Sequence, residues 1–213
     1  MSKHHYSTII LIFLCLQACQ KAEIEPLGNF DIGALPLAAI APADNPITEE
    51  KIKLGRLLFF DPILSANNKV ACASCHSPTK GFTDGLQRST GFTSNVMTTR
   101  NSPTILNAAF NGMNHLGEHN PELSPMFYDN RANSLEEQCF GPLLSPAEMM
   151  GPEFSAIEYI PFLEEKVFQI KEYRALFKDA FGDSTITIEK VTQALATYER
   201  TLITPNSAFD RFA

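Results

Sequence analysis

The chain has 213 residues, 44% of them hydrophobic and 19% charged, with a formal net charge of −7. This length and composition predict one globular domain of ordinary size. The negative charge argues against nucleic acid as a partner, because surfaces that bind nucleic acid are basic. An acidic surface would instead suit a basic protein partner.

A short apolar run over residues 9–16 follows the basic start of the chain. The run is too short to cross a bilayer and has the length of the hydrophobic part of a signal peptide. It leads into Leu-Gln-Ala-Cys, which resembles the cleavage site of a bacterial lipoprotein, with Cys19 as the lipidated residue. We therefore expect a lipoprotein signal peptide over 1–18, a periplasmic location and a lipid anchor. An ordinary signal peptide cut near Ala18 is the alternative.

Prolines are frequent and periodicity is weak in the next segment, so we expect a tether and N-terminal arm over 19–46. The domain proper is expected over 47–213. Thr48 is a suitable N-cap, and Asp61-Pro62 should end the helix that it starts.

The sequence Cys72-Ala73-Ser74-Cys75-His76 is a C-x-x-C-H run. Two thiols three positions apart on one helical turn can each bond to the porphyrin edge of a haem, and the next residue offers an imidazole to the iron. A redox dithiol and half of a zinc site are the alternatives for a bare C-x-x-C pair. The directly following histidine favours covalent haem c.

Residues 77–132 are rich in Gly, Asn, Ser, Thr and Pro, and we expect mostly loop there, with short helical turns near 102–109. So long a loop is unusual inside a compact domain. A covalently held haem would explain it, because the haem can act as core for loops that wrap it.

Helices are expected again beyond this loop. Capping boxes of the form S-x-x-E at 134–137 and 155–158 open two of them, and the first should end near Phe140, before a Gly-Pro pair. Apolar stripes predict further helices around 173–180 and over 187–202.

No segment alternates well enough to predict a sheet. Cys139, which has no obvious cysteine partner, is expected to be a small buried apolar residue. The predicted fold is therefore all-α, a cytochrome c-like haem domain with long loops around the haem.

Several further motifs follow one another in a fixed order, at residues 54–62, 100–104, 127–132, 134–138, 141–142 and 148–149. Together with the C-x-x-C-H run, they resemble the N-terminal domain of the bacterial di-haem cytochrome c peroxidases. That family includes the di-haem enzyme of methylamine utilisation. The resemblance runs from about residue 45 to the end of the chain.

The resemblance implies that the haem of this domain is the peroxidatic one. Cys72 and Cys75 would hold it and His76 would be its proximal iron ligand. Asn101 matches a calcium ligand of the family, although it could also be a loop residue that bonds its own backbone.

The resemblance also implies a distal pocket formed by Gln138, Pro142 and Glu148. Glu148 matches the general acid-base of the family, which moves a proton while the O–O bond of peroxide breaks. On local grounds alone, Glu148 could simply favour a helix dipole, Pro142 could be a helix stop, and Gln138 could be an ordinary helix residue.

Two residues depart from the family pattern. Phe92 stands where peroxidases that need reductive activation have a distal histidine, so the distal site could be open without activation. Tyr128 stands where the family usually has Trp between the haems; it could relay an electron, or it could pack with its ring partly buried. Alternative sixth ligands are Met97, Met113, His115, His119 and Met126.

The chain also ends where the family normally continues into a C-terminal haem domain, and it has one C-x-x-C-H run. We therefore expect one haem c here, a second in the full-length enzyme, and a fragment or truncated product of that enzyme. The expected function is reduction of hydrogen peroxide by electrons from a small cytochrome c or copper protein. The alternatives are a mono-haem electron carrier and an oxidase that acts on a protein or small molecule. A homodimer is also compatible with the sequence.

Overall fold

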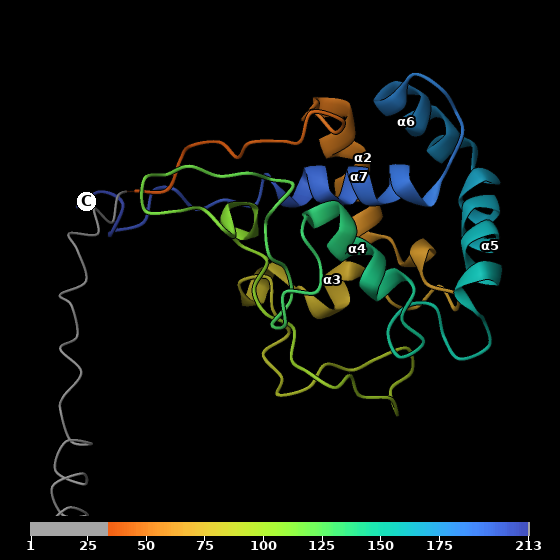
Figure 1. Ribbon diagram of the computed structural model, residues 1–213. Coiled ribbons are helices and arrows are strands. Elements are labelled where there is room, and N and C mark those ends of the chain that lie inside the picture. The colour runs from red at the N-terminus through yellow and green to blue at the C-terminus, as the bar shows by residue number, and fades with distance from the viewer. Residues whose placement is uncertain (1–33, 213) are drawn as a thin grey trace, which may run out of the picture. The chain divides into compact units, whose positions relative to one another are not determined.

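Residues 34–212 are described by the computed structural model of the chain (Figure 1). The predicted signal peptide over 1–18, the lipidation site Cys19 and most of the tether lie outside these residues. The described part belongs to one compact unit. None of its helices is long and apolar enough to cross a membrane.

The described residues form helices and no strands, so the predicted all-α class is confirmed. The α-helices are α2 (Glu49–Phe60), α3 (Cys72–Cys75), α4 (Leu135–Leu143), α5 (Ala156–Phe168), α6 (Lys171–Phe181) and α7 (Ile188–Glu199). Short 3-10 turns cover Pro62–Leu64, Pro78–Lys80 and Ala108–Phe110. Residues 111–134 contain no helix, so the predicted long loop is confirmed, and the turns expected near 102–109 shrink to Ala108–Phe110.

Helix α2 begins and ends where the sequence predicts. The Thr48 hydroxyl accepts a hydrogen bond from the Lys51 backbone N–H (3.2 Å), and Asp61 ends the helix. The buried face of α2 packs on α7, and Gly55 lies at the closest approach. A Cβ atom on Gly55 would collide with the carbonyl oxygen of Ala194, so this crossing requires glycine.

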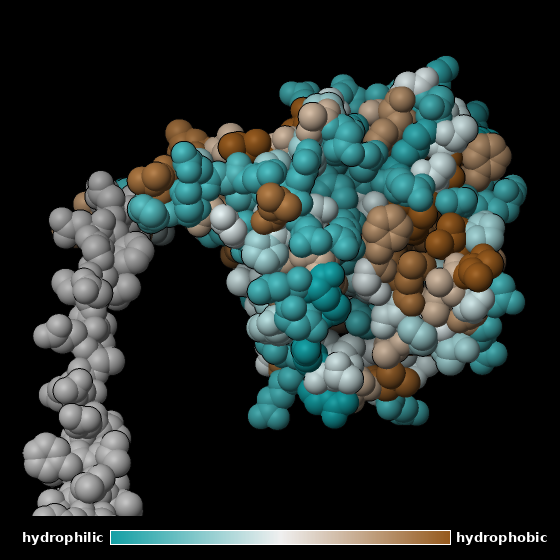
Figure 2. Space-filling view, viewed as in Figure 1, coloured by the Kyte–Doolittle hydropathy of each residue, from teal (hydrophilic) through white to brown (hydrophobic). Residues whose placement is uncertain are grey.

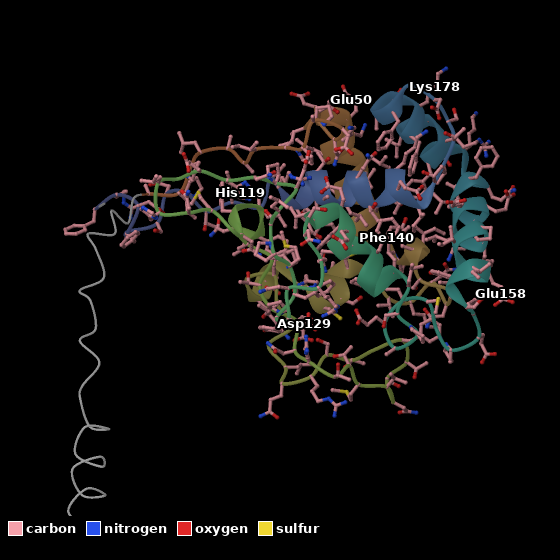
Figure 3. All side chains as sticks on the ribbon, viewed as in Figure 1. Glu50, His119, Asp129, Phe140, Glu158 and Lys178 are labelled. Atoms are coloured by element: carbon pink, nitrogen blue, oxygen red, sulfur yellow. The ribbon has the colours of Figure 1, made fainter. Side chains whose placement is uncertain are left out.

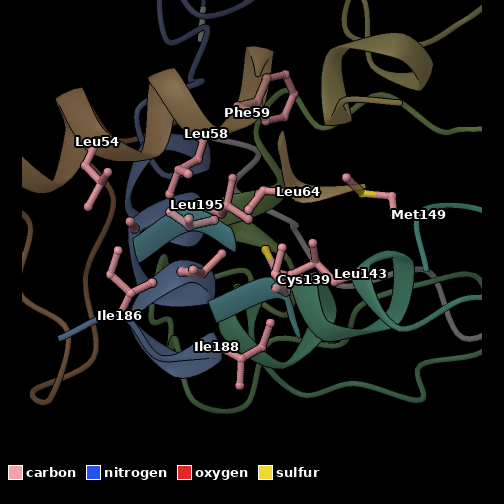
Figure 4. Packing of buried hydrophobic residues seen from close by; sticks show 14 of the residues in the cluster. Leu54, Leu58, Phe59, Leu64, Cys139, Leu143, Met149, Ile186, Ile188 and Leu195 are labelled. Atoms are coloured by element: carbon pink, nitrogen blue, oxygen red, sulfur yellow. The ribbon is translucent and has the colours of Figure 1, made fainter. Parts of the chain in front are cut away.

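The main core lies between these two helices and α4. Figure 4 shows Leu58 of α2 and Leu195 of α7 meeting Cys139 and Leu143 of α4. Cys139 is 5% exposed, which confirms the prediction that it is buried. Helix α4 is therefore held against the core by its buried face, which includes Cys139 and Leu143.

Helix α4 differs from the prediction at its C-terminal end. Its start is as expected, because the Ser134 hydroxyl accepts from the Glu137 N–H (3.1 Å). The helix does not stop at Phe140 but continues through Pro142 to Leu143. Proline removes the N–H that would donate to the Gln138 carbonyl, but only Leu143 of the helix follows it, so little helix remains to be disrupted. The extension keeps Pro142 on the helix and in register with Gln138.

The surface seen in Figure 2 is mostly hydrophilic, with a patch of hydrophobic residues between α4 and α5. Helix α5 begins at the predicted capping box, where the Glu158 carboxylate accepts from the Ser155 N–H (3.0 Å). Helix α6 covers the predicted range 173–180 and extends beyond it at both ends, whereas α7 lies within the predicted range 187–202. The two helices complete the helical side of the domain. The long loop occupies the other side, next to α3 (Figure 1).

Candidate functional site

A cavity of about 430 Å³ lies between α3, α4, α7 and the long loop. This volume is in the range of sites for cofactors and small molecules. All of the predicted site residues within the described part line it: Cys72, Cys75, His76, Asn101, Tyr128, Gln138, Pro142 and Glu148. Residues that are up to 76 positions apart in the sequence therefore meet at one cavity.

Helix α3 places both cysteines of the C-x-x-C-H run at the cavity. Cys72 and Cys75 are free thiols, and the Ser74 hydroxyl accepts from the Ala71 N–H (3.0 Å) at the start of the helix. Burial raises the pKa of Cys72 to about 12 and also raises the pKa of Cys75. Reactive dithiols have lowered pKa values, so this environment disfavours a redox dithiol and suits uncharged thioethers.

A zinc site has no ligand set in the described residues, where no three His, Cys, Asp or Glu side chains cluster. The sequence also holds His115 and His119 at a spacing that zinc sites use. Neither lines the cavity that contains the two cysteines.

The His76 ring is oriented by the loop that follows it. Its Nδ1 lies 3.1 Å from the carbonyl oxygen of Phe82, which can only accept, so Nδ1 carries the proton in this bond. Phe82 itself has a positive φ of 57°, and this turn brings its carbonyl back to the ring. Burial lowers the pKa of His76, which keeps the imidazole neutral. A neutral ring fixed through Nδ1 leaves Nε2 available to a metal.

Glu148 lies at the start of the segment after α4 and is half-buried. Burial raises the pKa of its carboxyl above the usual 4.5, against the opposing effects of a hydrogen bond from Ser145 and the charge of Arg131. The preceding residue is held in place, because the Phe92 N–H donates to the Ala147 carbonyl (2.7 Å). Glu148 is thus a carboxyl with a raised pKa on an anchored segment, as a proton-transfer group requires.

Gln138 and Pro142 are four residues apart on α4 and therefore lie on the same face of the helix. That face forms part of the cavity wall, together with Cys139 and Leu143. The polar amide of Gln138 is the hydrogen-bonding group that α4 contributes beside this otherwise apolar wall.

The predicted residues Tyr128 and Asn101 contact each other. The Tyr128 hydroxyl donates to Asn101 Oδ1 (3.2 Å) at the exposed edge of the cavity. Tyr128 is 60% exposed, so its ring is not part of the hydrophobic core.

Charged residues flank this tyrosine on the same loop. Asp129 pairs with Arg100 (3.1 Å) and Arg131 (2.6 Å), and these hydrogen bonds lower the pKa of Asp129. All three side chains line the cavity. Figure 3 shows Asp129 near α3, whereas His119 lies farther out along the loop.

Of the alternative sixth ligands, Met126 lines the cavity, whereas Met97, Met113, His115 and His119 do not. Met126 is 3% exposed, and its sulfur accepts a hydrogen bond from Asn111 Nδ2 (3.5 Å). Phe92 is not a lining residue; its ring packs against the backbone of Gly151.

Glu199, a buried carboxylate at the end of α7, also lines the cavity and was not predicted from the sequence. A signal was present, because Val191, Leu195 and Glu199 are spaced four apart and form one helix face. A charged residue that continues an apolar stripe is a candidate for a buried polar group.

Comparison with known proteins assigns the family. A family model described as di-haem cytochrome c peroxidase matches residues 49–213. The methylamine utilization protein MauG of Methylophilus methylotrophus is 36% identical over 98% of this chain and 55% of its own length. The cytochrome c551 peroxidase of Nitrosomonas europaea is 35% identical over 83% of this chain and 46% of its own length.

A crystal structure of a MauG-like protein associated with microbial copper homeostasis aligns with a TM-score of 0.70 and 28% identity, over 86% of this chain and 49% of that chain. The chain thus spans about half the length of the relatives it matches. These matches, the helical fold and the cavity agree: the chain belongs to the di-haem cytochrome c peroxidase family, whose cofactor is haem c.

Proposed function

We propose that this domain holds one haem c in the cavity and uses it to reduce hydrogen peroxide. The observation that carries the proposal is the convergence of the C-x-x-C-H residues with Gln138 and Glu148 on one cavity of about 430 Å³. Attachment residues alone would suit any cytochrome. A carboxyl with a raised pKa at the same cavity adds a group for proton transfer.

The side chains around the cavity fit the proposed cofactor. Cys72 and Cys75 would form the two thioether bonds, and His76 would bind the iron through Nε2 because its Nδ1–H is bonded to Phe82. Arg100 and Arg131 are the cations on the loop side of the cavity and would bind the carboxylates of the porphyrin.

When bound, the haem supplies the iron at which peroxide binds and through which electrons reach it. Ionised Glu148 would accept a proton from the peroxide oxygen nearer the iron and donate it to the departing oxygen. The Gln138 amide would orient the peroxide by hydrogen bonding, and Pro142 would limit the width of the pocket. Overall, one peroxide, two electrons and two protons give two water molecules.

The electrons would come from a small cytochrome c or copper protein. The acidic chain, with its net charge of −7, is suited to a basic donor. In a full-length enzyme of this family, a second haem would pass these electrons on. Tyr128 would lie on their route, because its exposed ring stands at the outer edge of the cavity.

Two other activities are supported by particular residues. Phe92 cannot bind iron, and the similarity to MauG proteins favours an oxidase that acts on a protein or small molecule. Met126 lines the cavity, and ligation of the iron by its sulfur would favour a mono-haem electron carrier.

Several further properties also belong to this proposal. We propose a periplasmic protein anchored by lipid at Cys19, with a calcium ion near Asn101 and with homodimer formation. Radiolabelled palmitate incorporation into wild type but not Cys19→Ala would support the anchor, and its absence from wild type would exclude it.

The test of the function is expression in a host that attaches haem c, followed by a haem stain of the denatured protein. Covalent haem and rapid reaction of the ferric protein with peroxide are expected. High-spin iron would agree with an open distal site. A haem-free product, or a low-spin haem inert to peroxide, would contradict the peroxidase proposal.

A further inference from the structure

Glu199 is a buried carboxylate that the proposed peroxide chemistry does not use. It is the last residue of α7 and is 6% exposed, and its side chain lines the haem cavity. The Cys139 thiol approaches its Oε1 at 4.0 Å. Its Oε2 is buried and has no hydrogen-bond partner. An unpartnered oxygen beside a cofactor cavity is unexplained by core packing.

The nearest cation does not neutralise this carboxylate. Arg200 is the next residue, but its guanidinium binds both oxygens of Glu136 at 2.5 and 2.7 Å. Glu199 also stands at the C-terminal end of α7, where the helix dipole disfavours a negative charge. Burial outweighs the attraction of Arg200 and raises the pKa of Glu199 to about 7.

The other titratable groups around Glu199 come from each helix packed there. They are Cys72 of α3, Glu136 and Cys139 of α4, and Tyr198 of α7. Helix α2, which packs on α7, carries the cations Lys51, Lys53 and Arg56. Lys51 donates to Asn45 Oδ1 (2.9 Å), and Arg56 interacts with Tyr198. Lys51 and Arg56 therefore already have partners, Lys53 is exposed to solvent, and the remaining groups are neutral or negative.

Glu199 lines the same cavity as the attachment residue Cys72, and its charge contributes to the raised pKa of the Cys72 thiol. In this low-dielectric interior, a change in the charge of the iron strongly changes the free energy of ionising a nearby carboxyl group. We propose that Glu199 binds a proton when the haem is reduced and releases it when the haem is oxidised. This inference rests on the proposed haem attachment, and it assigns a role separate from that of Glu148.

A one-electron donor outside the site reduces ferric to ferrous iron, which removes one positive charge from the interior. A proton from solvent binds the free Oε2 of Glu199, which adds one positive charge. When a one-electron acceptor outside the site takes the electron back from the haem, Glu199 returns the proton to solvent. The net charge of the buried site is therefore unchanged, which favours electron transfer in both directions.

The test is a redox titration of the haem-loaded chain as a function of pH. In wild type, the reduction equilibrium should change by up to tenfold per pH unit around neutrality, or about 59 mV for a one-electron couple. In Glu199→Gln, the potential should be independent of pH in this window and equal to the acid limit of wild type. Glu189→Gln, at an exposed position on the same helix, should keep the wild-type slope. A slope that persists in Glu199→Gln would overturn the inference.

A second measurement covers the case in which Glu199→Gln does not fold. Redox-difference infrared spectra of wild type should show a carboxylic acid C=O band that grows on reduction and shifts in D₂O. The same band should persist in Glu148→Gln, and its absence from wild type would overturn the inference. A haem stain made first separates the two proposals: a haem-free chain contradicts the proposed function, whereas a loaded chain with a pH-independent potential contradicts only the role of Glu199.

Discussion

The backbone N–H of Phe92 donates a 2.7 Å hydrogen bond to the carbonyl of Ala147, the residue before Glu148. The Phe92 ring also packs on Gly151 so closely that a Cβ atom at position 151 would collide with it, and the φ of 78° at Gly151 separately favours glycine. Phe92 of the long loop thus contacts the chain both before and after Glu148, the proposed proton-transfer group: its backbone binds Ala147 and its ring packs on Gly151.

Phe92→Ala should therefore slow peroxide cleavage without loss of haem. The backbone bond to Ala147 is retained, but the segment loses its packing against the ring. We expect a loss of about 1–3 kcal/mol in the free energy of unfolding, because the ring is only partly buried. Urea unfolding and stopped-flow peroxide kinetics measure the two effects, and an unchanged rate in a destabilised protein would show that Phe92 does not position Glu148.

Glu148→Gln should slow peroxide cleavage by about 10²- to 10⁴-fold, the usual contribution of general acid–base catalysis. The amide has the same shape but cannot accept the proton. Haem content should be unchanged, because the side chain is not an attachment residue. Glu153→Gln, at an exposed position five residues later, is the matched control and should react like wild type. Equal rates in the two variants would remove Glu148 from the mechanism.

The rate of peroxide cleavage should rise with pH through the raised pKa of Glu148. The carboxyl must be ionised to accept a proton, and burial keeps it protonated to a higher pH than an ordinary glutamate with a pKa of 4.5. The rate should fall about tenfold per pH unit below that pKa and level off above it. The profile should be lost in Glu148→Gln; the same profile in both proteins would assign it to another group.

Met126→Leu should leave the ferric haem spectrum unchanged. The Met126 sulfur already accepts a hydrogen bond from Asn111, and the buried side chain packs with Leu135 and Ala132. Met113→Leu, at a position outside the cavity, is the control. A change from low-spin to high-spin iron in Met126→Leu alone would show that the sulfur binds iron, and would favour the electron-carrier function.

Gly55→Ala should destabilise the fold by about 1–3 kcal/mol. Two effects oppose each other, since alanine raises helix propensity by about 1 kcal/mol, whereas its Cβ would collide with the Ala194 carbonyl. The collision should dominate, because a helix carbonyl cannot move without moving α7. Lys53→Ala on the exposed face of α2 is the control and should not destabilise. If thermal unfolding showed Gly55→Ala to be more stable than wild type, then α7 must shift to make room for the Cβ atom.

Local chemistry allowed most helix starts to be predicted from the sequence. Thr48, Ser134 and Thr187 each accept a hydrogen bond at the helix that they cap. The end of α4 was mispredicted because Pro142 stands one residue before the helix end, where the loss of one backbone hydrogen bond disrupts no further turn. Glu199 was missed because its burial depends on α3 and α4, which are distant in sequence.

The sequence by itself determined the helical class and the C-x-x-C-H run, because capping and attachment depend on residues within one helical turn. It also named Gln138, Pro142 and Glu148 through the resemblance to the peroxidase family. Only the tertiary structure decided that these residues face one cavity, that Tyr128 reaches Asn101, and that Glu199 lacks a partner. Burial and electrostatic environment are set by contacts between distant segments, and those contacts exist only once the chain has folded.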